Sequence, residues 1–145
     1  MGGWVTALTA AHDKQLLGAA MISAGNMGWL GKLPREQAIK ALRTNGMEAL
    51  AGTTPELMAD ELIANADRFD FVKAAPQLTG SNLFVLTSDD GLAPMSSALS
   101  AALVKAGGGT RTMRQHVATD HSWSDARVRL QAEVLGWLET LQARK

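Results

Sequence analysis

An apolar run near the middle of the chain constrains the fold most. Residues 82–87, NLFVLT, hold four consecutive apolar side chains, which is typical of a strand buried on both faces of a parallel sheet. Two further segments, 18–24 (GAAMISA) and 111–117 (RTMRQHV), are also expected to form strands. The second alternates between apolar and polar residues and should therefore be more exposed. The sequence predicts about three parallel strands.

The segments between these strands have the apolar spacing of helices. Helices are expected at residues 4–16, 34–50, 55–67 and 95–106 and from about 122–125 to the end. Alternating strands and helices predict an α/β fold with helices flanking a parallel sheet. The chain has 145 residues, a length that suits one domain. We expect a single domain over 1–145, with residues 26–80 forming a short helical cap.

Composition excludes several classes of function. The net charge is zero and the charges alternate in sign, so a nucleic-acid or anionic-membrane partner is not expected. The absence of cysteine excludes disulfides, thiolate metal sites and cysteine nucleophiles. No apolar stretch approaches the roughly 20 residues of a membrane span, and the N-terminus lacks the basic start of a secretory signal. The compartment is left open, with the cytoplasm as the default.

An acid and a histidine follow two of the predicted strands. Asp90 lies just after residues 82–87, in DDGLAP, and His121 lies just after residues 111–117, in ATDHSWS. Neighbouring parallel strands end at the same edge of a sheet, so the two side chains should come within reach of each other. A carboxylate that orients an imidazole is part of a nucleophilic triad. Asp89 and His116 are expected to be structural.

The same residues carry a resemblance to a known family. NLFVLTSDDGLAP followed by ATDHSWSDARVRLQAEVLGWL resembles the C-terminal part of an α/β-hydrolase, in the branch of prolyl-oligopeptidase-like and dienelactone-hydrolase-like serine hydrolases. The resemblance implies hydrolysis of a small-molecule or peptide acyl substrate, by an esterase or peptidase without metal or cofactor. It implies Asp90 as the catalytic acid and His121 as the base. It also places Met27 and Trp29 where the family has its cap and acyl pocket.

The first residues resemble the end of that family's nucleophile elbow. Met1-Gly2-Gly3 is similar to the elbow sequence G-H-S-M-G-G cut directly after its serine. The resemblance implies that the backbone of Met1 stands at the oxyanion position and that the serine precedes this chain. We therefore expect a fragment that is inactive alone. Ser23 is rejected as a replacement nucleophile, because Met21 stands where the elbow needs glycine.

A non-catalytic function is the alternative. Residues 18–24 would form an apolar strand at an open edge of the sheet, and such edges pair readily with other strands. The chain would then be a truncated hydrolase-like module that acts by self-association or partner binding. Asp90 and His121 would be remnants in that case.

Overall fold

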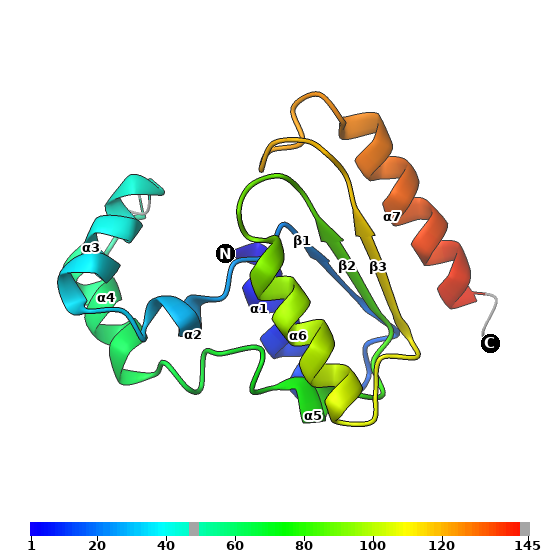
Figure 1. Ribbon diagram of the computed structural model, residues 1–145, viewed down its shortest axis with the longest axis horizontal. Helices are drawn as coiled ribbons and strands as arrows, with labels where there is room; N and C mark the ends of the chain where they lie inside the picture. The colour runs from blue at the N-terminus through cyan, green and yellow to red at the C-terminus, as the bar shows by residue number, and fades with distance from the viewer. Residues whose placement is uncertain (47–49, 143–145) are drawn as a thin grey trace. The chain divides into compact units, whose positions relative to one another are not determined.

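The computed structural model describes residues 1–46 and 50–142. It contains two compact units, and the larger is built from residues 1–25 together with the chain from residue 74 onward. The smaller unit spans residues 26–73. Figure 1 shows the helices and strands of both units.

The larger unit contains a sheet of three parallel strands. These are β1 (Ala19–Ile22), β2 (Leu83–Thr87) and β3 (Thr112–His116), and they lie side by side in the order β1-β2-β3. Ile22 is opposite Leu86, and Thr87 is opposite His116. The prediction of an α/β fold with three parallel strands and flanking helices is confirmed at this level.

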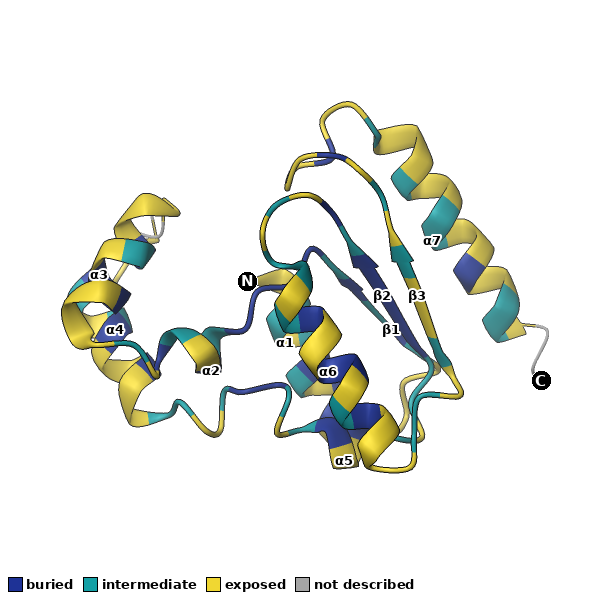
Figure 2. Ribbon diagram, viewed as in Figure 1, coloured by how far each residue is buried: buried dark blue, intermediate teal, exposed yellow. Residues whose placement is uncertain are grey.

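Helices cover both faces of the sheet. Helices α1 (Gly2–His12) and α6 (Ala93–Lys105) lie on one face, and α7 (Arg127–Gln142) lies on the other (Figure 1). On the α7 face, Phe84 of β2 stacks on Trp137 with ring centroids 5.7 Å apart. Figure 2 shows β2 as the most buried strand, and its first four residues are all buried. The central strand is therefore packed on both faces, as its apolar run predicted.

Several predicted element ends were wrong. The first helix ends at His12 rather than at residue 16, because Asp13 is extended and its carboxylate accepts the Gln15 backbone N–H at 2.9 Å. The last helix begins at Arg127, because a turn that includes Trp123 in a left-handed conformation precedes it. The helix predicted over 34–50 ends at Thr44, and residues 47–49 of that prediction lie outside the described residues.

The smaller unit is helical. It contains α2 (Met27–Leu30), α3 (Arg35–Thr44) and α4 (Pro55–Ala64), whereas the short α5 (Ala75–Leu78) belongs to the larger unit. The buried core of the smaller unit is formed by one side of α3 and one side of α4. Its residues are Ala38, Ile39, Leu42, Ala59 and Leu62.

A buried polar contact ties the two ends of the smaller unit together. The Asn26 side-chain amide donates to Asp70 at 2.7 Å, and Lys32 pairs with the same carboxylate at 2.5 Å. Asn26 and Asp70 are 4% and 6% exposed, so each needs a partner to be buried without a large cost. The segment 26–73 between β1 and β2 is therefore held together by hydrogen bonds among its own residues.

Candidate functional site

The loops after β2 and β3 meet at the carboxyl edge of the sheet. The backbone N–H of Asp89 donates to the carbonyl of Thr119 at 3.0 Å, which joins the two loops. Gly91 has a φ of +79°, a conformation that favours glycine and lets the chain turn from the strand into α6. Parallel strands bring residues distant in sequence to one edge, the usual place for a site in such sheets.

Asp90 and His121 form a hydrogen-bonded pair at this edge. His121 Nδ1 lies 2.7 Å from Asp90 Oδ2, while Asp90 Oδ1 accepts the Leu92 backbone N–H at 2.9 Å. The Asp90 side chain is 4% exposed, whereas that of His121 is 60% exposed. The acid is therefore fixed inside the protein, and the imidazole reaches solvent with Nε2 left for proton transfer. Their catalytic role stays a prediction.

The environment of Asp90 favours its ionised form. Burial acts to raise the pKa of the Asp90 carboxyl, but hydrogen bonds outweigh it. These bonds come from His121, from the Leu92 backbone and from the Ser88 side chain, and together they hold the pKa below its usual value. Asp90 is thus a charged acceptor at neutral pH, which favours a proton on His121 Nδ1.

A second acid–histidine pair lies beside the first. His116 Nε2 is 3.0 Å from Asp89 Oδ1, and His116 Nδ1 is 3.0 Å from Thr87 Oγ1. Both side chains are largely open to solvent, with exposed fractions of 50% for His116 and 64% for Asp89. An exposed pair contributes little to stability. This contact was not predicted from the sequence. It follows from the strand register, which sets His116 opposite Thr87, two residues before Asp89.

The structure also places Met1 and Ser23 at the carboxyl edge. Met1 precedes α1, and its carbonyl accepts the N–H groups of Trp4 and Val5 at 3.0 and 3.2 Å. Its oxyanion role stays a prediction. Ser23 is buried directly after β1, where its Oγ lies 2.7 Å from Ser88 Oγ and accepts the Trp123 indole N–H at 3.1 Å. The Ser23 hydroxyl is thus engaged internally, consistent with its rejection as a nucleophile.

Met27 and Trp29 lie on α2 in the smaller unit. Met27 is partly buried and packs against the core of that unit, while Trp29 is 49% exposed. Their assignment to a substrate pocket stays a prediction.

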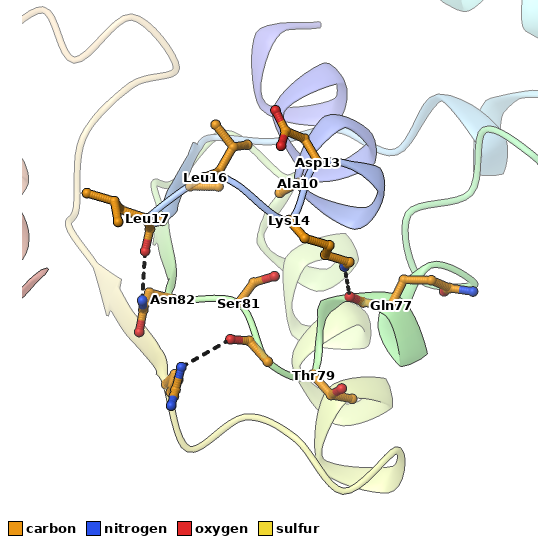
Figure 3. Close-up of a pocket in the computed structure, with 13 residues that line it drawn as sticks. Ala10, Asp13, Lys14, Leu16, Leu17, Gln77, Thr79, Ser81 and Asn82 are labelled. Carbon is orange, nitrogen blue, oxygen red and sulfur yellow. Dashed lines mark hydrogen bonds between the residues drawn. The ribbon is translucent and has the colours of Figure 1, made fainter. Parts of the chain in front are cut away.

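A hollow in the larger unit lies elsewhere, at the amino-terminal end of the strands. It has a volume of about 520 Å³ and includes Lys14, Gln77 and Arg111 in its lining. Figure 3 shows Lys14 directed at the Gln77 carbonyl, with Nζ and O 2.5 Å apart, and Arg111 donates to the Gly80 carbonyl at 3.4 Å. Both cationic side chains donate to backbone carbonyls of the protein. The hollow therefore presents no acid–base pair comparable to Asp90 and His121.

Within residues 1–46 and 50–142, no group of three or more His, Cys, Asp and Glu side chains could hold a metal ion. None of the described helices is long and apolar enough to cross a membrane.

No protein-family model, no curated protein and no solved structure matches this chain. The Asp90–His121 pair is therefore the principal feature from which a function can be inferred.

The lowered pKa of Asp90 predicts how stability changes with pH. We expect Asp90→Asn to lower the free energy of unfolding by about 1.5–3 kcal/mol at pH 6–7, because bonds to a charged acceptor are lost. A carboxyl with a depressed folded-state pKa stabilises the protein above its unfolded pKa of about 3.9 and loses that contribution as pH falls further. The difference between wild type and Asp90→Asn should therefore shrink below about pH 4.

Urea titrations between pH 3 and 7 measure this difference. The control is Asp89→Asn, which removes a carboxylate that is 64% exposed and should change stability by less than about 0.5 kcal/mol. An equal effect of the two substitutions at pH 7, or a penalty for Asp90→Asn that does not change with pH, would contradict the interpretation.

Proposed function

We propose that the chain provides the acid and the general base of an α/β-hydrolase-type serine hydrolase, with Asp90 as the acid and His121 as the base. The observation that carries the proposal is a buried carboxylate bonded to the Nδ1 of an exposed imidazole, 2.7 Å away, at the carboxyl edge of a parallel sheet. The carboxylate fixes the tautomer of the ring and stabilises its charged form during proton transfer.

The packing of α1 supports a nucleophile that enters from the N-terminal side of this helix. A Cβ added to Gly3 would lie 2.6 Å from Ala24 Cβ and 3.4 Å from the Ile22 carbonyl oxygen. The first turn of α1 is therefore pressed against the end of β1, at the same edge as Asp90 and His121. A serine that precedes Met1, or is supplied by another chain, would approach the site from this direction.

The proposed reaction is acyl transfer to water. The serine hydroxyl attacks an ester, amide or thioester carbonyl while His121 Nε2 accepts its proton. The protonated ring then gives this proton to the leaving group, and the acyl-serine forms. In the second half, a water molecule attacks the acyl carbon while His121 takes its proton, and the ring then returns a proton to the serine oxygen as the acyl–serine bond breaks and the acid is released. Backbone N–H groups at the elbow, including that of Met1, would stabilise the oxyanion.

The test uses the protein with the residues encoded in frame before codon 1. We expect it to react with a fluorophosphonate probe, and mass spectrometry should locate the label on a serine just before Met1. His121→Ala should slow labelling by about a hundredfold or more, since a general base contributes on that scale. The matched control His116→Ala removes the other histidine of this edge and should leave labelling roughly unchanged.

Three results would refute the proposal. They are a stop codon directly before codon 1 with no serine donated by another chain, a label on a serine elsewhere, and labelling that does not depend on His121.

A non-catalytic function has one specific observation in its favour, which is the position of β1 at the edge of the sheet. The Ala19 and Ser23 N–H groups donate to the carbonyls of Asn82, just before β2, and of Leu86 in β2, at 2.9 Å each. Because a parallel ladder uses alternate residues, the backbone groups of Ala20 and Ile22 point away from β2. They are available to a strand of another copy, and self-association through β1 is our second proposal.

Proline substitution separates the two sides of β1. Ala20→Pro removes an N–H directed away from β2, so it should preserve the sheet but abolish pairing at the edge. Met21→Pro, the control, removes an N–H of the β1–β2 ladder and should destabilise the fold. Sedimentation velocity should show a dimer for the wild type and a monomer for Ala20→Pro. A wild-type chain that stays monomeric at tens of micromolar would exclude this second function.

A further inference from the structure

We propose that a hollow between α6 and the strands β2 and β3 binds the phosphate group of a small organic molecule. The hollow has a volume of about 310 Å³, within the range of small-molecule sites. Side chains of β2 and β3 line it on the sheet, and serines of α6 line it on the helix. It lies toward the β3 edge of the sheet, opposite to β1. The inference goes beyond the proposed hydrolysis and needs none of its catalytic residues.

The strand register sets the floor of the hollow. Arg114 of β3 is opposite Val85 of β2, so the two side chains share one face of the sheet. Phe84, which precedes Val85, stacks on Trp137 of α7, and successive residues of a strand point to opposite faces. Val85 and Arg114 therefore point to the face covered by α6 (Figure 1). Helix α6 packs on β2, while β3 is exposed or half-buried along its length (Figure 2). Arg114 is thus open to a ligand.

Arg114 is a cation without an acidic partner. None of the ion pairs among the described residues includes it, and none of the described residues that line the hollow is acidic. The other basic side chain of the hollow, His116, is engaged at both ring nitrogens, by Asp89 and by Thr87. A guanidinium presents five N–H donors in a planar fork that matches the oxygens of a phosphate or a carboxylate. Arg114 is therefore the charged donor of the hollow.

Ser96 of α6 supplies an unused hydroxyl. The residue is 2% exposed and lines the hollow. Its hydroxyl has no hydrogen-bond partner among the described residues, yet no fully enclosed side-chain oxygen or nitrogen there lacks one. The Ser96 hydroxyl must therefore open into the hollow, where a ligand oxygen could accept its hydrogen bond. The buried Ser100 is different, because its hydroxyl already donates to the Ser96 carbonyl at 3.1 Å.

These donors fit a tetrahedral oxyanion. Arg114 can bond two oxygens through parallel N–H groups, and the hydroxyls of Ser96 and the exposed Ser97 border the same space from the helix. A phosphate monoester has three terminal oxygens to share among them. A carboxylate has two, which the guanidinium fork alone would occupy. The volume of the hollow leaves room for the organic part of the ester.

The experiment is an NMR titration of the chain with glycerol phosphate, inorganic phosphate, acetate and glycerol, at a fixed ionic strength of about 0.15 M. Glycerol phosphate should shift the Arg114 Nε–H signal and the Ser96 and Ser97 backbone signals in a saturable way, with a Kd of about 1 mM or below. Inorganic phosphate should shift the same signals with weaker affinity. Acetate should bind at least about tenfold more weakly than glycerol phosphate, since it engages the guanidinium alone, and glycerol should shift nothing.

Two variants and a control assign the binding to these residues. Arg114→Gln and Ser96→Ala should each raise the Kd for glycerol phosphate by about tenfold or more, the scale of one hydrogen bond to a charged group. Ser96→Ala should leave the Tm of the unliganded protein unchanged, because no bond within the protein is lost. Arg127→Gln removes the same charge from α7, on the opposite face of the sheet, and should leave the Kd unchanged.

Four results would overturn the proposal. They are shifts that do not saturate, an equal loss of affinity in Arg114→Gln and Arg127→Gln, acetate binding as tight as that of glycerol phosphate, and inorganic phosphate binding as tight as that of the ester. Because no hydrolysis is measured, failure of the proposed function alone would leave this result standing.

Discussion

The buried carboxylate of Asp90 is the group on which the rest of the site depends. Its side chain is 4% exposed, and a charge so placed needs hydrogen bonds to be stable. Those bonds come from the His121 ring and the Leu92 backbone N–H. The same contacts fix the loop after β2, couple it to the loop after β3 and leave one nitrogen of His121 available. Folding stability and the proposed chemistry therefore use the same atoms.

The apolar pattern of the sequence and the parallel topology it implies made part of the site predictable. The apolar run before Ser88 indicated a central parallel strand, and parallel strands bring their carboxyl ends together, so Asp90 and His121 were expected to meet. The bond from Trp123 to Ser23 was not predictable, since it joins residues 100 positions apart without any local motif. The left-handed backbone at both residues also has no signal, because neither is glycine. The contact between His116 and Asp89 was missed because it depends on strand register.

The two proposed functions make different demands on β1. The proposed hydrolysis uses the carboxyl end of the strand, against which the first turn of α1 packs. Self-association uses the outer edge, where the backbone groups of Ala20 and Ile22 point away from β2. A substitution at the edge and one at the end therefore test separate properties of one strand. The Asp90–His121 pair, with one partner buried and one exposed, is the feature that favours hydrolysis.

The most direct test of this account is a pair of double-mutant cycles at pH 7. One cycle combines Asp90→Asn with His121→Ala, and the other combines Asp89→Asn with His116→Ala. The account predicts a coupling free energy of about 1.5 kcal/mol or more between Asp90 and His121, because the carboxylate is buried. It predicts less than about 1 kcal/mol for the exposed pair. Equal coupling in the two pairs, or weaker coupling between Asp90 and His121, would contradict it.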